Sequence, residues 1–249
     1  MLLRADNLSR RFGGLLAVDR TSLEVPAGGL IGLIGPNGAG KTTLFALLSG
    51  FLAPSTGQVW FDGVDITAEQ PHLRTLRGIA RTFQIVQPFA GLSVRENIAV
   101  GAFLRHKPRR EALQRAEAMA HTVGLGPMLD SPASALTIAG RKRLELARAL
   151  ATEPRLLLLD EVLAGLNPSE VRDMLPVIRA IRGLSVSILM IEHVMQAVMS
   201  LCDHVHVLSQ GRMIASGPPQ AVCADPLVVE AYLGHGAAAR LRHGGAAVA

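Results

Sequence analysis

A glycine-rich turn directly after an apolar run limits the fold of this chain more than any other feature. The run is Leu30-Ile31-Gly32-Leu33-Ile34, and the turn is Gly35-Pro36-Asn37-Gly38-Ala39-Gly40-Lys41-Thr42-Thr43. A buried strand that leads into such a turn, followed by a helix over Thr42–Ser49, brings several backbone N–H groups and a helix N-terminus to one small volume. The pattern therefore favours a polyphosphate ligand held at the end of a strand.

The residue types at the end of this turn fit nucleotide chemistry. Lys41 can reach the β- and γ-phosphates of a bound polyphosphate as a point charge, and the Thr42 hydroxyl can ligate Mg²⁺. Glycines keep side chains away, so the backbone can approach the phosphates closely. We therefore predict that a polyphosphate and Mg²⁺ bind here, and the predicted cofactor-binding residues are Gly35, Pro36, Asn37, Gly38, Ala39, Gly40, Lys41, Thr42 and Thr43.

The composition is typical of a globular protein. Hydrophobic residues make up 49% of the 249 residues and charged residues 18%, so the chain can bury a full core. The longest apolar candidate, Ile188–Ile191, is too short to cross a bilayer and stops at Glu192. Asp6 lies where a secretory signal needs its apolar core, so we expect a cytosolic location. The net charge of +5 is scattered, and it supports an anionic partner only weakly.

Strand signals dominate the first third of the chain and helical periodicity the middle. Two strands, over 2–8 and 17–25, flank Gly13-Gly14, and a hairpin turns at Asp62-Gly63. From about 93 to 152 the pattern is helical. Strands and helices then alternate, with strands over 156–159, 187–191 and 205–208 and helices over 168–182 and 194–201. We predict a mainly parallel α/β sheet, an N-terminal antiparallel β subdomain and an inserted helical subdomain at about 93–152.

Two carboxylates stand at the end of one predicted strand. Leu156–Leu159 is followed by Asp160 and Glu161, and the carboxyl ends of parallel strands form the ligand crevice of such a sheet. We expect Asp160 to hold Mg²⁺, directly or through water, and Glu161 to polarise a water for in-line attack on the γ-phosphate. A hydrophobic run that ends in Asp-Glu is ambiguous alone, and the phosphate loop makes it informative.

The order of these motifs resembles the ATP-binding subunits of ATP-binding cassette (ABC) transporters over nearly the whole chain. The resemblance implies a P-loop NTPase core of the RecA-like type. It also implies that Phe12 stacks on adenine, that Gln84 is the glutamine of the Q-loop, and that His193 is the switch histidine. Each of these residues alone has an ordinary structural explanation, so their joint order carries the assignment. Gln84 can reach Mg²⁺ or the attacking water, and an uncharged His193 can donate to a γ-phosphate oxygen.

One segment departs from the family pattern. Leu136–Gly140 occupies the position of the signature, usually Leu-Ser-Gly-Gly-Gln, but Ile138 and Ala139 replace two glycines. Thr137 keeps a hydroxyl for phosphate, and a helix beginning near Gly140 would aim its positive end at an anion. The resemblance implies that Thr137, Ala139 and Gly140 contact the nucleotide of another subunit, and the departure puts close backbone approach to that nucleotide in question.

Several local strings are similar to the branch of the family that imports branched-chain amino acids. They are Arg10–Val18, Ala80–Gln84, Arg143–Arg148, Ala164–Pro168 and Glu230–Gly234. The resemblance implies an ATP-hydrolysing subunit of an importer of branched-chain or related amino acids, peripheral on the cytoplasmic face of the inner (plasma) membrane. Its implied partners are membrane-spanning permease subunits, a second ABC ATPase subunit, identical or different, and indirectly a periplasmic binding protein.

Two other functions stay open at this point. Importers of urea or another small amide have similar ATPases, and some ABC ATPases act on DNA or ribosomes instead of transporting. The second group usually carries two cassettes or a long coiled-coil insertion, and neither is visible in this sequence, so we expect no nucleic-acid partner. We expect the ABC ATPase domain over 1–233 and a mobile C-terminal tail over 234–249.

Overall fold

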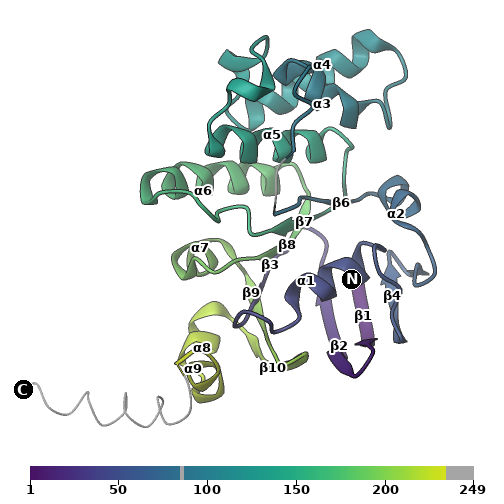
Figure 1. Cartoon of the computed structure of the whole chain (residues 1–249), viewed down its shortest axis with the longest axis vertical. Helices are drawn as coiled ribbons and strands as arrows, with labels where there is room; N and C mark the ends of the chain where they lie inside the picture. Colours follow the sequence, from purple (N-terminus) through teal and green to yellow (C-terminus); the bar gives the residue numbers. More distant parts are fainter. Residues whose placement is uncertain (85–86, 234–249) are drawn as a thin grey trace, which may run out of the picture.

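The larger of two β-sheets organises the chain, as the computed structural model shows for residues 1–84 and 87–233 (Figure 1). Its strand order is β10-β9-β3-β8-β7-β6. The strands are β3 (Leu30–Ile34), β6 (Ile79–Arg81), β7 (Leu156–Asp160), β8 (Ser187–Ile191), β9 (His204–Ser209) and β10 (Arg212–Gly217). All neighbours pair in parallel except β10, which is antiparallel to β9. The predicted mainly parallel sheet is confirmed.

The smaller sheet is antiparallel, in the order β2-β1-β4-β5, as the N-terminal pattern predicts. Its strands are β1 (Leu3–Phe12), β2 (Leu15–Val25), β4 (Thr56–Phe61) and β5 (Val64–Asp65). The first hairpin is longer than the sequence pattern indicates, because β1 continues to Phe12, which pairs with Leu15. The turn between them is Gly13-Gly14, and Gly13 has a φ of 55°.

Alternating side chains of the central strands divide the core into two clusters. Along β7, Leu156 and Leu158 join the cluster that lines the smaller sheet, while Leu157 and Leu159 join the cluster under the helices of the other face. Helix α1 (Lys41–Leu48) contributes four fully buried side chains to the first cluster. The helix is therefore held between the two sheets, at the end of β3.

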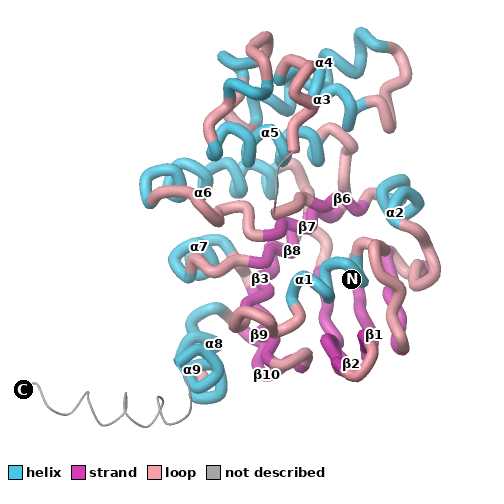
Figure 2. Tube along the Cα trace, viewed as in Figure 1, coloured by secondary structure: helices cyan, strands magenta, loops and turns pink. Residues whose placement is uncertain are grey.

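Helices α3 (Val94–Ala102), α4 (Arg109–Thr122) and α5 (Ile138–Leu150) lie together at one end of the molecule, beyond α6 (Pro168–Gly183) (Figures 1 and 2). They follow β6 and precede β7 in the chain. Their buried apolar residues belong to the same cluster as one face of the central sheet. We propose that residues 93–152 form a helical subdomain. Its core is continuous with that face of the central sheet.

Shorter elements complete the described fold. They are α2 (Pro71–Arg77), α7 (Met195–Leu201), α8 (Pro219–Ala224) and α9 (Pro226–Leu233), with 3₁₀ turns at Gly126–Met128 and Ala133–Ala135. The sequence pattern did not indicate α2, α8, α9, β6 or β10. Across the described part of the chain, no helix is long and apolar enough to cross a membrane. The mobile tail predicted over 234–249 lies outside the described residues.

A buried arginine from α2 fixes the far end of α1. Arg74 is 1% exposed, and its guanidinium donates to the carbonyls of Leu47 and Leu48, each at 2.8 Å. Burial lowers the pKa of Arg74 to about 10. Because the last carbonyls of a helix lack partners within it and carry its negative end, a cation there is stabilising. Arg74 thus fixes the C-terminal end of α1, and the N-terminal end of the helix follows the glycine-rich turn.

Candidate nucleotide-binding site

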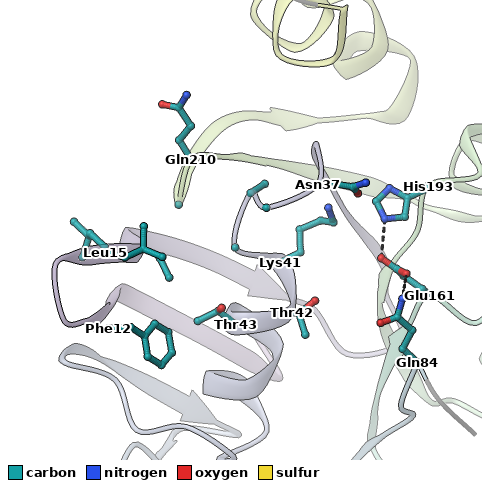
Figure 3. Close-up of a pocket in the computed structure, with 16 residues that line it drawn as sticks. Phe12, Leu15, Asn37, Lys41, Thr42, Thr43, Gln84, Glu161, His193 and Gln210 are labelled. Atoms are coloured by element: carbon teal, nitrogen blue, oxygen red, sulfur yellow. Dashed lines mark hydrogen bonds and ion pairs between the residues drawn. The ribbon is translucent and has the colours of Figure 1, made fainter.

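A cavity of about 1090 Å³ lies at the carboxyl ends of the central strands (Figure 3). Strands β3, β8, β7 and β6 are neighbours in that order, so the segments that follow them meet at one edge of the sheet. The residues that line the cavity are Phe12, Leu15, Leu16, Ala17, Asn37, Gly38, Ala39, Gly40, Lys41, Thr42, Thr43, Gln84, Glu161, His193, Gln210 and Gly211. Residues far apart in the chain thus form one pocket.

Helix α1 opens into this cavity without a capping side chain. Its N-cap residue is Gly40, which has a φ of 102°, and no side chain bonds to the first turn. The first turn also contains no acidic residue. The first N–H groups of a helix have no partner within the helix, and they carry its positive end. The start of α1 is therefore built to accept an anion from the cavity.

Two glycines of the loop are required by its close packing. A Cβ at Gly35 would overlap the carbonyl oxygen of Leu208, and a Cβ at Gly40 would overlap that of Ala17. Both glycines have a positive φ, which side chains rarely tolerate. The loop is thereby pressed against β9 and β2, which fixes its shape before any ligand binds.

Lys41 is turned back onto its own loop. Its ammonium donates to the carbonyls of Gly35 at 2.7 Å and Pro36 at 3.0 Å, and the side chain is largely buried. Burial lowers the pKa of Lys41, and the nearby charges of Glu161 and Asp160 partly oppose this shift. Gly35 and Pro36 do not line the cavity themselves, and they act on Lys41 through these carbonyls.

The carboxylate of Glu161 is held between two donors (Figure 3). Gln84 Nε2 donates to Glu161 Oε2 at 2.8 Å, and His193 Nε2 lies 2.7 Å from Glu161 Oε1. The side chain of Glu161 is 17% exposed and that of His193 is 37% exposed. Three residues from three separate motifs therefore form one connected group at the cavity wall.

Asp160 lies deeper than the sequence pattern suggests. It is 3% exposed and does not line the cavity, and its Oδ2 is 2.8 Å from Arg81 Nη2. Arg81 follows the buried start of β6, and its guanidinium lies among the rings of Phe45, Phe51 and Phe83. One oxygen of this predicted metal ligand is thus already engaged by a cation.

The tip of the first hairpin forms the apolar end of the cavity. Phe12 and Leu15 project from it, and they are 42% and 67% exposed. The guanidinium of Arg10 lies over the Phe12 ring at 4.8 Å from the centroid. An exposed aromatic ring with a polar loop beside it offers a surface on which a planar base can stack.

The segment Leu136–Gly140 lies away from this cavity. Helix α5 begins at Ile138, two residues earlier than the predicted start near Gly140. The reason is that Thr137 caps the helix, because its Oγ1 accepts from the Gly140 N–H at 3.1 Å. Thr137, Ala139 and Gly140 do not line the pocket of their own chain. The Thr137 hydroxyl still has its proton to donate.

The oxygen donors of the cavity fit Mg²⁺ bound together with a phosphate. The residues that the structure describes contain no cluster of three or more His, Cys, Asp or Glu placed to hold a metal alone. Magnesium commonly uses one or two protein oxygens with phosphate oxygens and water. The Thr42 hydroxyl, the Gln84 amide and the Glu161 carboxylate are hard donors at one wall, and Asp160 lies behind them.

Three residues at or near the site were not indicated by the sequence. Tyr232 in α9 accepts a hydrogen bond from the Gly35 N–H at 2.7 Å, although it lies 197 positions away. Gln210 lines the cavity from the turn between β9 and β10. Arg81 pairs with Asp160. Arg81 and Tyr232 stand in strings that are similar to the family, but no sequence signal indicated the contacts of these three residues, which depend on long-range folding.

Comparison with known protein families gives two matches. The ABC transporter model matches residues 18–164, and the model described as branched-chain amino acid ATP-binding cassette transporter matches residues 212–238. The first match covers more than half of the chain. The second covers β10, α8 and α9, and α9 contains the Tyr232 that contacts Gly35.

Individual proteins of this family are similar to the chain over almost the full length of both sequences. The chain is 38% identical to the high-affinity branched-chain amino acid transport ATP-binding protein BraF of Pseudomonas aeruginosa and 37% identical to LivG of Escherichia coli. Each alignment covers 94% of this chain and 98% of the relative. Among solved structures, an ABC transporter cassette in its ADP conformation is 31% identical with a TM-score of 0.85, over 94% of this chain and 99% of the other.

Proposed function

This chain belongs to the ATP-binding subunits of ABC transporters, and we propose that it hydrolyses ATP to drive the uptake of branched-chain amino acids. The main support for nucleotide binding is the start of α1, which has no capping side chain. Lys41, the first residue of α1, lines the same cavity as Glu161 and His193. Support for the transported solute comes from relatives described as branched-chain amino acid transport proteins.

The first step is the capture of the phosphates by α1 and Lys41. In this structure the Lys41 ammonium is bonded to the Gly35 and Pro36 carbonyls. We infer that a phosphate draws it toward the cavity, because an anion is a stronger partner for a cation than a neutral carbonyl is. The backbone N–H groups of Gly38–Thr43 then surround the phosphates, and Phe12 stacks on the adenine.

Magnesium would be held by Thr42, Gln84 and, through water, Asp160, and when bound it would neutralise charge on the transferred phosphoryl group. The Asp160 carboxylate keeps its orientation through Arg81, which bonds one of its oxygens. The Thr42 hydroxyl stands at the first turn of α1, next to the groups that bind phosphate.

Glu161 would orient the attacking water and accept its proton. Both of its carboxylate oxygens already have a partner here, Gln84 and His193, and each oxygen keeps a second lone pair that can accept from a water. We infer that Gln84 turns toward the metal and that His193 turns to donate to the γ-phosphate. The three-residue group is then a resting arrangement, and nucleotide binding converts it into the catalytic one.

A second ABC subunit would complete the site. Thr137, Ala139 and Gly140 lie outside the cavity of their own chain, on the exposed start of α5. We propose that this start faces the nucleotide of another cassette, whose own signature in turn covers the cavity described above. The first turn of α5 keeps a positive helix end for that role even though Ile138 replaces a glycine.

The permease subunits would dock beside the Q-loop. Phe83 and Phe89 are 43% and 48% exposed, and they line a groove of about 390 Å³ together with Arg148. Exposed aromatic rings near an arginine are typical of the anchoring points of protein interfaces. We propose that this groove receives a cytoplasmic segment of the permease and that the chain lies on the cytoplasmic face of the membrane.

The test uses the full chain assembled with its permease and second cassette in lipid vesicles. ATP hydrolysis is measured with the binding protein and, separately, leucine, isoleucine, valine or urea outside the vesicles. We expect stimulation by a branched-chain amino acid. Stimulation by urea alone would contradict the proposed solute, and the Glu161→Gln complex reports any contaminating ATPase.

A further inference from the structure

We propose that Lys142 is a positioning residue for ATP hydrolysis, which ties helix α5, whose start is Thr137–Gly140, to the backbone of Glu161 and Gln84. The side chain of Lys142 is 6% exposed. Its ammonium donates to the Gln84 carbonyl at 3.1 Å and to the Glu161 carbonyl at 3.3 Å. One buried cation therefore connects the two residues whose side chains meet at the cavity wall. The inference rests on the proposed role of Glu161.

The backbone of Glu161 needs such support. Its φ is 49°, in the left-handed region that residues with side chains seldom adopt. Its N–H donates to the Ile191 carbonyl at 3.0 Å, and its carbonyl also accepts from the Ala164 N–H at 3.1 Å. Lys142 adds a charged donor to this carbonyl. The strained peptide that aims the Glu161 carboxylate into the cavity is thus fixed from a third side.

A second side chain of α5, Glu145, contacts the backbone next to Gln84. Glu145 lies one turn after Lys142, where side chains of a helix share a face. It is 4% exposed, and its Oε1 accepts from the Phe83 N–H at 2.7 Å. The two residues thus hold backbone groups of neighbouring residues, the Phe83 N–H and the Gln84 carbonyl. Burial of a cation and a carboxylate on one helix face is costly unless both are bonded, and here both are.

The position of this face gives it a role beyond local packing. Lys142 lies in the second turn of α5, whose first residue directly follows the Thr137 cap. A helix transmits displacement as a rigid element, so a shift of Thr137–Gly140 at the start of α5 moves the Lys142 ammonium. Contact of the α5 start with one nucleotide would therefore change the position of Glu161 at the other nucleotide. Lys142 is the physical link through which the two sites are coupled.

Substitution of Lys142 tests this link, and Arg143 provides the matched control. Arg143 is the next residue of α5 and also donates to two backbone carbonyls, those of Val123 at 2.9 Å and Asp173 at 3.2 Å. Those carbonyls belong to the α4 and α6 regions and lie outside the cavity. The variants Lys142→Met and Arg143→Met each remove one cation and two hydrogen bonds, but only the first touches the site.

Turnover and KM for ATP are measured in the vesicle-bound complex, and ATP affinity is measured on the full chain with a fluorescent analogue. We expect Lys142→Met to lower kcat by about tenfold to a hundredfold, the loss that follows a small displacement of a catalytic group. KM and affinity stay within about twofold, because the phosphate-binding groups are unchanged. Lys142→Gln, whose shorter amide can still donate, gives an intermediate kcat. Arg143→Met keeps the wild-type kcat.

The proposal is overturned if Lys142→Met and Lys142→Gln both turn over like Arg143→Met. It is also overturned if kcat falls only in proportion to ATP affinity, as it would for general loosening of the fold. Glu161→Gln separates this failure from that of the proposed function. An active Glu161→Gln complex removes the proposed role of Glu161, whereas an inactive one beside a fully active Lys142→Met complex contradicts the positioning role alone.

Discussion

Arg81 Nη2 lies 2.8 Å from Asp160 Oδ2, in an ion pair whose side chains are only 9% and 4% exposed. Arg81 also donates to Ser49 Oγ at 3.2 Å, at the end of α1. The pair thus connects β6, β7 and the helix of the phosphate loop. A carboxylate predicted to hold Mg²⁺ is in this structure the centre of a buried polar junction.

Replacement of Arg81 by Met should destabilise the chain strongly. Loss of one partner leaves the Asp160 charge buried without its cation, which costs about 3–5 kcal/mol in free energy of unfolding. Urea unfolding measures this. The control is Arg155→Met, which breaks an ion pair with Asp62 whose side chains are about half exposed and which should cost about 1 kcal/mol or less. If both variants lost the same free energy of unfolding, the prediction that the buried Arg81–Asp160 pair stabilises the fold more than an exposed pair would be wrong.

Removal of the Lys41 ammonium should weaken nucleotide binding itself. A charged hydrogen bond contributes about 1.5–3 kcal/mol, so Lys41→Ala should bind ATP about tenfold to a hundredfold less tightly in calorimetry. Lys107→Ala carries the same change in net charge at an exposed position and should bind as the wild type does. Unchanged affinity in Lys41→Ala would contradict the role of the loop as a phosphate site.

The hydroxyl of Tyr232 should stabilise the start of the phosphate loop. Tyr232→Phe removes the acceptor of the buried Gly35 N–H and leaves the ring in place. A buried N–H without a partner costs about 1–3 kcal/mol, and we expect that decrease in the free energy of unfolding. If urea unfolding of the variant matches the wild type, α9 does not support the loop through this bond.

Glu192 should make stability depend on pH. Its carboxylate accepts from the Leu163 N–H at 3.0 Å, and burial raises its pKa from 4.5 to about 7, with the charge of Glu161 adding to the shift. The folded state therefore holds a proton that the unfolded chain releases. This contribution is fully present below pH 4.5 and is lost as pH rises through 7.

Glu192→Gln isolates that effect, because an amide oxygen can still accept from Leu163 but does not ionise. At pH 8 we expect the variant to be more stable than the wild type by up to about 3 kcal/mol, from 1.36 kcal/mol for each pKa unit. The difference should shrink as pH is lowered toward 5. A difference that does not vary with pH in urea unfolding would contradict the raised pKa of Glu192.

Much of the fold follows from local patterns in the sequence. The β8 strand over Ser187–Ile191 was predicted with the same bounds, because an uninterrupted apolar run in an α/β chain is buried on both faces. The β6 strand over Ile79–Arg81 was missed, since three residues give no periodicity. The start of α5 was placed too late, near Gly140, although Thr137 caps the helix and Ile138 is its first residue. Ile138 is 61% exposed in the structure, so its apolar side chain does not belong to the buried face that helical periodicity detects.

Some residues of the site were predictable from sequence motifs, and others were not. Lys41, Glu161 and His193 could be named from their motifs, and the strand order brings them together. The partner of Asp160 could not be named, because Arg81 becomes a partner only when β6 pairs with β7. Lys142 has no motif either, since its role depends on two carbonyls, which every residue carries.

Glu161 is the residue on which the proposed ATP hydrolysis most directly depends. The measurement is a comparison of wild-type and Glu161→Gln proteins in the assembled complex, with ATP affinity and ATP turnover determined on the same samples. We predict that affinity is retained, because the α1 start, Lys41 and Thr42 are intact, while turnover falls by about a hundredfold or more. Wild-type turnover in Glu161→Gln would contradict the proposed mechanism, because the carboxylate between Gln84 and His193 would then have no part in hydrolysis.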